Sequence, residues 1–177
     1  MFVPLPSEKK CSESHTVQTH RIFPNDLNSF GALYGGKLMS LIDDTASIAV
    51  SRHCRRPCMT ASTDTLDFLH PIYENDSVTV QAYVSGAGRK SMEVFIKVIG
   101  EVLKTGERYL AATSFMTFVV VDSEDNFVGV PAVIPESVEE KLIHEGYQKR
   151  RDNRLKELAS NKKLGEHISL TLPYMDN

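Results

Sequence analysis

The order of apolar and polar positions along the chain predicts one strand, one long helix and then four more strands. Residues 15–23 (HTVQTHRIF) are rich in β-branched and aromatic side chains, which is typical of a strand. After its first residue, the stretch 36–53 contains no glycine or proline, which predicts a helix. Turn residues then separate four β-like stretches, near residues 58–69, 76–87, 91–104 and 108–121.

This order of elements predicts an antiparallel sheet that wraps around one long helix. One strand, one helix and four consecutive strands form an α+β order, because α/β proteins alternate strands and helices. Residues 1–14 are interpreted as a polar lead-in. Residues 136–159 are interpreted as a second, highly charged helical region that Gly146 interrupts.

Asp43 is the most unusual residue of the predicted central helix. Apolar side chains cover most of the helix circumference, which predicts a buried helix, and its polar stripe contains Asp44. Asp43 lies instead among small and apolar neighbours such as Met39 and Ala46. An unpaired buried carboxylate is costly, so we expect Asp43 to be paired, hydrogen-bonded or functional. Two interpretations stay open: a structural Asp that binds a neighbouring backbone group, and a catalytic carboxylate.

Gly35 and Gly36 mark the start of the same helix. Glycines allow another molecule to approach the free N–H groups of the first helical turn, where an anion or a polarised carbonyl can bind. Close packing of the helix start is the alternative reason for two glycines. A carbonyl held at these N–H groups would lie near Asp43.

Composition excludes several classes of protein. The chain has 177 residues, a net charge of −3 and a pI near 6.1, which argues against a nucleic-acid-binding protein. No apolar run reaches the roughly 18–20 residues of a membrane span, and the first residues lack the apolar segment of a signal peptide. Three cysteines are too few, and odd in number, for a disulfide framework. We therefore expect a soluble, cytoplasmic protein with no nucleic-acid and no membrane partner.

Charge is distributed unevenly along the chain. Residues 141–163 contain eight basic and three acidic residues, a local charge of +5, so the rest of the chain carries −8. Such a segment is typical of a solvated helix face, and an anionic partner such as a phosphate-bearing ligand is the alternative. Arg150, Arg151 and Arg154 are the candidates for phosphate contacts.

A longer ordered motif connects the two glycines with Asp43. Residues 28–43 (NSFGALYGGKLMSLID) resemble the pattern N-x-x-G-x-x-x-G-G-x-x-(apolar)-x-x-(apolar)-D of the hotdog-fold acyl-CoA thioesterases, in the branch of cytosolic acyl-CoA hydrolases. The similarity continues through shorter segments at 52–54, 60–62, 67–68, 88–92 and 112–121. It covers about residues 15–135, and the order of elements also matches a hotdog fold.

The resemblance implies an active site that two subunits share. Asn28 and Asp43 would face each other across a dimer, with Asp43 acting as general base on water or as nucleophile. Asn28 would position the water or the thioester, and the N–H of Gly36 would stabilise the developing oxyanion. Thr60 matches a position that helps to hold the water. The implied reaction converts a fatty acyl-CoA and water into a free fatty acid and coenzyme A.

The resemblance also implies where coenzyme A binds and how the protein assembles. The family's phosphate-side turn is matched by Gly88, Arg89, Lys90 and Ser91, and a β-turn with incidental charge is the alternative. No metal and no separate cofactor is implied, because coenzyme A is part of the substrate. We expect a dimer, with dimers stacked as a trimer of dimers. The hotdog domain would span residues 12–135, and residues 136–177 would form a charged C-terminal helix and tail.

Other chemistries fit the sequence less well. His53, Cys54 and Cys58 look like part of a zinc site, but no fourth ligand follows at a useful spacing. The G-x-S-x-G elbow of α/β-hydrolases is missing. The alternative function is a hotdog module that senses acyl-CoA or a nucleotide without turnover, and the presence of both Asn28 and Asp43 disfavours it.

Overall fold

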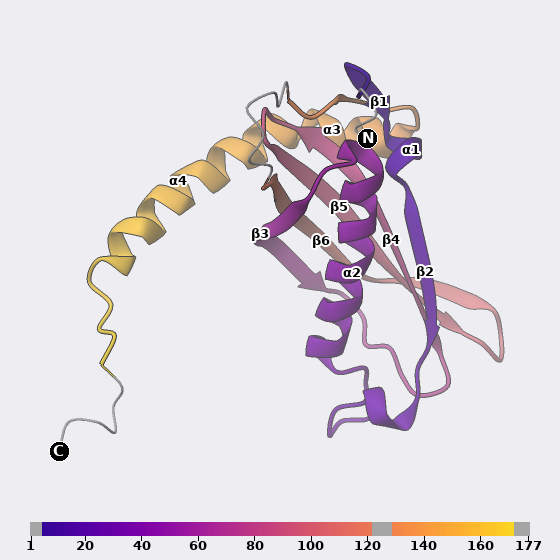
Figure 1. Cartoon of the computed structure of the whole chain (residues 1–177). Helices are drawn as coiled ribbons and strands as arrows, with labels where there is room; N and C mark the ends of the chain where they lie inside the picture. Colours follow the sequence, from indigo (N-terminus) through magenta and orange to yellow (C-terminus); the bar gives the residue numbers. More distant parts are fainter. Residues whose placement is uncertain (1–4, 122–128, 172–177) are drawn as a thin grey trace. The chain divides into compact units, whose positions relative to one another are not determined.

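The structure, a computed structural model, describes residues 5–121 and 129–171 (Figure 1). Residues up to His144 form one compact unit, and residues from Glu145 onward form a second. The strands of the first unit are β1 (Glu8–Lys10), β2 (Thr16–Arg21), β3 (Cys58–Phe68), β4 (Ser77–Ala87), β5 (Ser91–Val102), β6 (Glu107–Val120) and β7 (Ala132–Ile134). The α-helices of the chain are α1 (Cys11–Ser14), α2 (Gly35–Cys54), α3 (Val138–Glu145) and α4 (Tyr147–Gly165).

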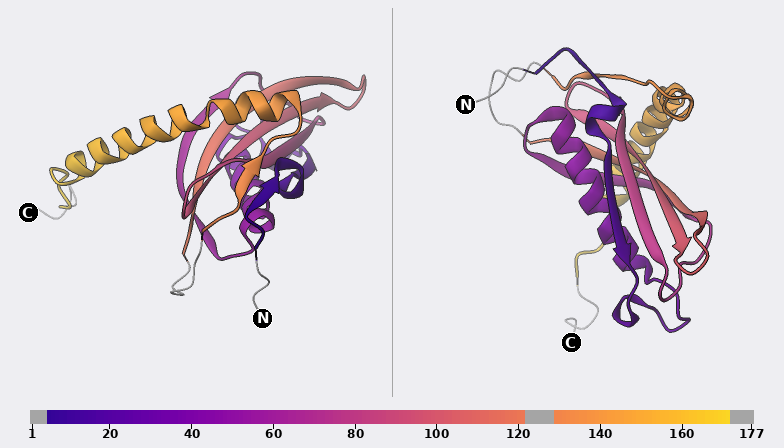
Figure 2. Two further views of the ribbon diagram at one scale, coloured as in Figure 1. Left: turned by 90° about the horizontal axis from the view of Figure 1, so that it is seen from above. Right: turned by 90° about the vertical axis from the view of Figure 1, so that its right-hand side faces the viewer.

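Five strands form one antiparallel sheet in the order β2-β4-β5-β6-β3. Figures 1 and 2 show α2 lying along one face of this curved sheet. The predicted α+β arrangement is therefore confirmed, and the bounds of these five strands agree with the sequence to within about three residues. The first strand ends two residues earlier than expected, because the Pro24–Asp26 segment turns the chain.

Helix α2 packs on the sheet through one apolar stripe. Its buried residues recur every three or four positions: Leu38, Leu41, Ile42, Thr45, Ala46, Ala49, Val50, His53 and Cys54. Each large aliphatic side chain buried in this way contributes about 1.5–3 kcal/mol. The exposure of Ser40, Asp44 and Ser47 agrees with the predicted polar stripe. The expected burial of the apolar remainder of the helix is wrong at Met39, which is 48% exposed in the single chain.

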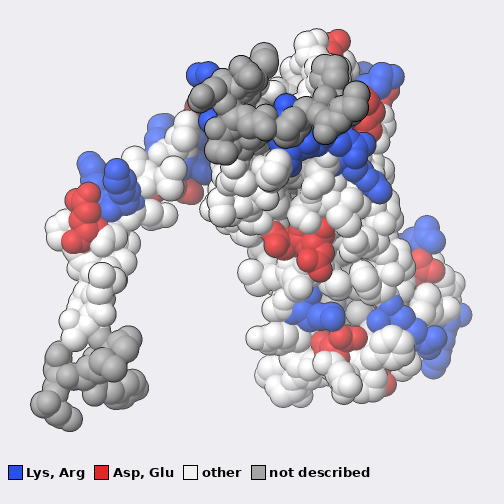
Figure 3. Space-filling model, in the orientation of Figure 1, with Lys and Arg blue, Asp and Glu red and all other residues white. Residues whose placement is uncertain are grey.

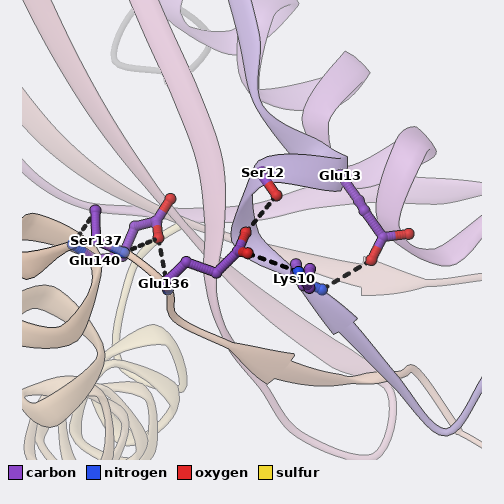
Figure 4. A network of polar contacts seen from close by, with 6 residues as sticks. All are labelled: Lys10, Ser12, Glu13, Glu136, Ser137 and Glu140. Atoms are coloured by element: carbon purple, nitrogen blue, oxygen red, sulfur yellow. Dashed lines mark hydrogen bonds and ion pairs between the residues drawn. The ribbon is translucent and has the colours of Figure 1, made fainter.

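The prediction that residues 1–14 are only a polar lead-in is also wrong. Strand β1 pairs in parallel with β7, and Cys11 in α1 is fully buried. Lys10 and Ser12 both donate to the carboxylate of Glu136, which joins the two ends of this compact unit (Figure 4). The ordered lead-in was not visible in the sequence because a three-residue parallel pair has no hydrophobic period of its own.

Helix α3 begins at a capping box. The Ser137 hydroxyl accepts the Glu140 N–H at 3.1 Å, and the Glu140 carboxylate accepts the Ser137 N–H at 2.8 Å (Figure 4). The Lys97 ammonium on β5 pairs with the Glu139 carboxylate at 2.8 Å, which ties this helix to the sheet. Gly146 separates α3 from α4, as the sequence predicts. No helix among the described residues is long and apolar enough to cross a membrane.

Candidate active site

Asp43 and Thr60 meet between α2 and β3. The Thr60 hydroxyl donates to Oδ1 of Asp43 at 2.8 Å. Both residues line a cavity of about 260 Å³, together with Met39, Ile42, Thr63, Leu66 and Met116. Figure 3 shows acidic side chains gathered over the middle of α2 and β3. Asp43 is half-buried in the single chain, so its carboxylate is paired but still open to a ligand.

The direction of this hydrogen bond decides what each group can still do. Because the Thr60 proton is used on Oδ1, the Oδ2 atom of Asp43 remains available to accept a proton from a ligand. The lone pairs of the Thr60 oxygen can accept from the same ligand. A water molecule held by these two oxygens would lie in a cavity whose other walls are mostly apolar. This arrangement suits general base chemistry on water.

Asn28 lies in the loop between the Pro24–Asp26 turn and α2. Its Oδ1 atom accepts the N–H of Phe30 at 2.9 Å and that of Ala32 at 3.2 Å. Gly31 has a φ of +76°, a conformation that glycine adopts without strain, and this closes the loop. The carboxamide is therefore oriented by its oxygen, and its NH2 group is the part that can donate to a ligand.

Asn28 does not line the cavity of Asp43. It lines a second cavity of about 410 Å³, together with Ala32, Leu33, Gly35, Phe68, Leu69, His70 and Pro71. Within one chain, the two residues of the predicted pair thus belong to separate cavities. The sequence did not point to the segment from Phe68 to Pro71 as part of a site, although it predicts a turn at His70-Pro71. The exposed Phe68 ring, at 58% accessible surface, is the structural signal.

The two glycines at the start of α2 make room for aromatic rings. A Cβ atom on Gly36 would lie 2.6 Å from the ring of Tyr34, and one on Gly35 would lie 3.6 Å from Phe68. Because the Tyr34 ring is 60% exposed and could move aside, this contact is one packing reason for Gly36 but does not by itself require a glycine. The backbone N–H of Gly36 is also one of the first N–H groups of the helix, which have no acceptor within the helix. The two interpretations left open by the sequence are compatible.

The turn between β4 and β5 holds the predicted phosphate-side residues. The Gly88 N–H donates to the Ser91 carbonyl at 2.8 Å, and the Arg89 and Lys90 side chains are exposed. The strand register pairs Thr60 with Phe118 of β6, and Phe118 with Met92 of β5. The turn and Thr60 therefore lie at the same end of the sheet, two strands or about 10 Å apart.

His53, Cys54 and Cys58 have local partners. The His53 Nε2 atom pairs with the Pro131 carbonyl at 2.9 Å, and burial lowers the pKa of this imidazole. The Sγ atoms of Cys54 and Cys58 lie 3.2 Å apart. Among residues 5–121 and 129–171, no three His, Cys, Asp or Glu side chains are grouped closely enough to hold a metal ion.

Comparisons with known proteins agree with the motif. A family model described as "Thioesterase superfamily" matches residues 30–107. A Bacillus subtilis protein described as the uncharacterized acyl-CoA thioester hydrolase YkhA is 48% identical over 169 residues, which is 96% of this chain and 98% of that protein.

Solved structures give the same result. A Staphylococcus aureus acyl-CoA hydrolase, in complex with butyryl coenzyme A, coenzyme A and coenzyme A disulfide, is 36% identical. Its TM-score is 0.85, over 90% of this chain and 98% of that one. Mutants of the S. aureus enzyme named Asp43Ala, Thr60Ala and Asn28Ala have also been solved. A hexameric acyl-CoA thioesterase is 36% identical, with a TM-score of 0.82 over 87% of this chain and 99% of that one.

The sequence identity and the fold indicate the same family. The chain is 48% identical to the B. subtilis protein over almost its whole length, and it has the antiparallel sheet with a long helix on one face. The chain belongs to the thioesterase superfamily and is an acyl-CoA thioester hydrolase with the hotdog fold.

Proposed function

We propose that this enzyme hydrolyses fatty acyl-CoA thioesters, with Asp43 as the general base. The observation that carries the proposal is the 2.8 Å hydrogen bond from Thr60 to Asp43 in a cavity with apolar walls. Thr60 holds one carboxylate oxygen in place and leaves the other to take a proton. The S. aureus enzyme has the same residue types at the same three numbers, 28, 43 and 60.

The reaction needs few groups. Oδ2 of Asp43 takes a proton from water while the water oxygen attacks the thioester carbonyl carbon. The tetrahedral intermediate then expels the coenzyme A thiolate, and Asp43 returns the proton to the thiolate sulfur. A thiolate is a good leaving group, since ordinary thiols have a pKa near 8.5, so no strong acid is required.

The developing oxyanion needs donors, and we assign this role to the first turn of α2. The Gly36 N–H lies at the positive end of the helix dipole, where negative charge is stabilised. Removal of one such donor from an enzyme typically lowers kcat about 10²–10³-fold.

Asn28 of the partner subunit would complete the site. Asn28 and Asp43 line separate cavities within one chain, which supports a site where a second copy brings its asparagine to the carboxylate. Strand β3 is an edge strand that pairs only with β6 among the described residues, and it exposes Met59 and Phe68. Such an edge favours association with another copy. We propose a dimer as the active unit and a trimer of dimers as the assembly, as the hexameric relative suggests.

The turn from Gly88 to Ser91 would hold the phosphates of coenzyme A. Arg89 and Lys90 supply positive charge, and the turn lies at the same end of the sheet as Thr60. We assign the hydrolase domain to residues 12–135, which contain all of these groups. We place the enzyme in the cytoplasm, where its three free cysteines would stay reduced.

The test compares wild type with two neighbouring aspartate variants. Hydrolysis of a panel of saturated acyl-CoAs is followed by the loss of thioester absorbance. Asp43→Asn removes the base while keeping the shape of the side chain, and we expect kcat to fall about 10²–10⁴-fold. Asp44→Asn, on the exposed face of the same helix, is expected to keep wild-type turnover.

The two variants must both fold, which circular dichroism and thermal unfolding check. Near-normal turnover by folded Asp43→Asn would remove Asp43 from the mechanism. Tight acyl-CoA binding by wild type without hydrolysis of any chain length would contradict the proposed substrate. A covalent acyl adduct on Asp43, seen by intact mass after rapid quenching, would replace the general base with a nucleophile.

A further inference from the structure

Cys54 and Cys58 form a close pair of thiols at the junction of α2 and β3. Cys54 is the last residue of the helix and Cys58 is the first residue of the strand. Their Sγ atoms lie 3.2 Å apart, whereas a disulfide requires about 2.05 Å. The two sulfurs would have to approach by only about 1 Å. The connecting residues begin with Arg55, whose left-handed φ of 50° turns the chain back toward the helix end.

The surroundings favour a thiolate on Cys54. The hydrogen bond between the two sulfurs lowers the pKa of the Cys54 thiol, with a smaller contribution from the nearby positive charge of Lys9 and against the opposing effect of burial, and it raises the pKa of Cys58. Lys9, on β1, is held at the helix end by its hydrogen bond to the Arg52 carbonyl at 2.9 Å. The neighbouring His53 ring is turned toward Pro131.

Cys11 provides an internal contrast. It is fully buried, and its thiol donates to the Val84 carbonyl at 3.4 Å. Burial raises the pKa of Cys11 to about 12, so it stays a neutral thiol at physiological pH. Of the three cysteines, only the pair at the end of α2 combines a neighbouring sulfur with a half-exposed member, Cys58.

We propose that Cys54 and Cys58 are a redox site, which a small hydroperoxide converts into a reversible disulfide that slows the hydrolase. Cys54 has no accessible surface and Cys58 is half-exposed, so the oxidant must be small and must reach Cys54 by local opening beside Cys58. Hydrogen peroxide is of the right chemical class and close to water in size.

Hydrogen peroxide would oxidise the two thiols to a disulfide in two steps. The Cys54 thiolate attacks one oxygen of hydrogen peroxide, which breaks the O–O bond, gives Cys54 sulfenic acid and releases hydroxide. The Cys58 thiol then loses its proton as its sulfur attacks the Cys54 sulfur, which forms the disulfide and expels a second hydroxide. The two protons lost by the thiols convert the hydroxides into water. The dithiol loses two electrons and the peroxide gains them.

The effect on turnover follows from the position of the pair on β3. Cys58 lies two residues before Thr60, so both side chains point to the same face of the strand, and both contact α2. A disulfide would pull the start of β3 toward the end of α2 and shift Thr60 relative to Asp43. A displacement of about 1 Å in a catalytic group can cost about 10²-fold in rate. This part of the inference rests on the proposed role of Asp43 and Thr60, whereas the disulfide itself does not.

The first experiment maps the bond in the full chain. Reduced protein is treated with hydrogen peroxide, blocked with iodoacetamide and digested with trypsin. Trypsin cleaves after Arg55, so the Cys54 and Cys58 peptides stay joined only if a disulfide links them. We expect the linked peptide in wild type and in Cys11→Ser. In Cys58→Ser we expect Cys54 to stop at the sulfenic acid, which dimedone traps. The rate of oxidation should rise with pH, because the attacking thiol must lose its proton.

The second experiment measures activity in the same samples from the loss of thioester absorbance. Released coenzyme A is not detected with a disulfide reagent, because such a reagent would itself oxidise the cysteine pair. Peroxide is expected to lower wild-type turnover at least about tenfold, and dithiothreitol to restore it. Reduced Cys54→Ser and Cys58→Ser should hydrolyse acyl-CoA within about twofold of wild type, and Cys54→Ser should keep its activity in peroxide.

The outcomes separate this inference from the proposed function. Two free thiols at Cys54 and Cys58 after peroxide treatment, or a disulfide to Cys11, would overturn the redox site. A mapped Cys54–Cys58 disulfide with unchanged turnover would overturn its effect on the hydrolase. Absence of hydrolysis by the reduced wild type would instead refute the proposed substrate and leave the mapped disulfide standing.

Discussion

Strands β3 and β4 have the same length, eleven residues, and opposite roles. Strand β4 lies between β2 and β5, and most of its residues are buried. Strand β3 lies at the edge of the sheet and has no fully buried residue. The central strand holds the core together, and the edge strand supplies Thr60 and Cys58.

The difference has a physical origin in the two sequences. Strand β4 (SVTVQAYVSGA) has buried aliphatic residues at alternate positions, so this face packs on α2: Val78, Val80, Ala82 and Val84. Strand β3 is rich in hydroxyl and carboxylate side chains (CMTASTDTLDF), and two register shifts interrupt its pairing with β6. Such irregularities re-aim side chains near active sites. Reactive groups are therefore gathered where the backbone is least enclosed.

The largest expected effect concerns stability in the central strands. Ile96 of β5 is fully buried and pairs with Ala82 of β4. We expect Ile96→Ala to lower the free energy of unfolding by about 3 kcal/mol, because it removes buried methylenes and leaves a cavity. Urea denaturation at fixed protein concentration measures this loss.

The matched change on the edge strand is Thr65→Ala, at an exposed position of β3. It should change the free energy of unfolding by less than about 1 kcal/mol. If both variants lost the same free energy of unfolding, the edge strand would contribute as much to stability as the central pair. The difference in burial between the strands would then not reflect a difference in their roles.

A smaller effect, on turnover, is expected when a threonine of β3 is replaced by valine, and the same substitution in β4 serves for comparison. Thr60→Val keeps the shape of the side chain but removes the hydroxyl that binds Asp43. We expect kcat for acyl-CoA hydrolysis to fall about tenfold, or about 1.4 kcal/mol, with little change in unfolding. Steady-state kinetics and thermal unfolding of one preparation measure both quantities.

Thr79→Val in β4 serves as the control. Its hydroxyl pairs with that of Thr19 on β2 at 2.9 Å, far along the sheet from β3. Loss of this exposed bond should change the free energy of unfolding by no more than about 1 kcal/mol and leave kcat unchanged. A reversed pattern, with turnover lost at Thr79 and stability lost at Thr60, would contradict the division between the strands.

The sequence predicted the five sheet strands from their β-branched and aromatic residues and the turns between them, and the long helix from a stretch that lacks glycine and proline. The pairing of β1 with β7 could not be predicted in this way, since each strand has three residues and depends on a partner more than 120 positions away. Burial of the whole helix was overpredicted, because the sequence of α2 alone does not show how much of its surface one sheet covers.

The candidate site also contains features that the sequence could indicate and features that it could not. Asp43 and Thr60 come together because α2 and β3 are adjacent elements of one chain. Asn28 and Asp43 line separate cavities within one subunit, and the N–H groups of Phe30 and Ala32 hold the Asn28 carboxamide in its own loop. The Cys54–Cys58 contact depends on the left-handed turn at Arg55, which no local pattern indicates for a non-glycine residue.

The smallest expected effect concerns the two hairpin turns of β5, one at each end. Arg89 lies in the turn before β5, at the same end of the sheet as Thr60, and Lys104 lies in the turn after it. Arg89→Ala should raise KM for acyl-CoA about threefold without changing kcat, and the effect should shrink in high salt because an exposed cation is screened. Lys104→Ala removes the same charge from the distant turn and should leave KM unchanged. Equal increases in KM would mean that general positive charge, rather than the turn near β3, attracts coenzyme A. An increase in KM for Arg89→Ala alone would mean that the turn before β5 contributes to acyl-CoA binding, in addition to the groups on β3.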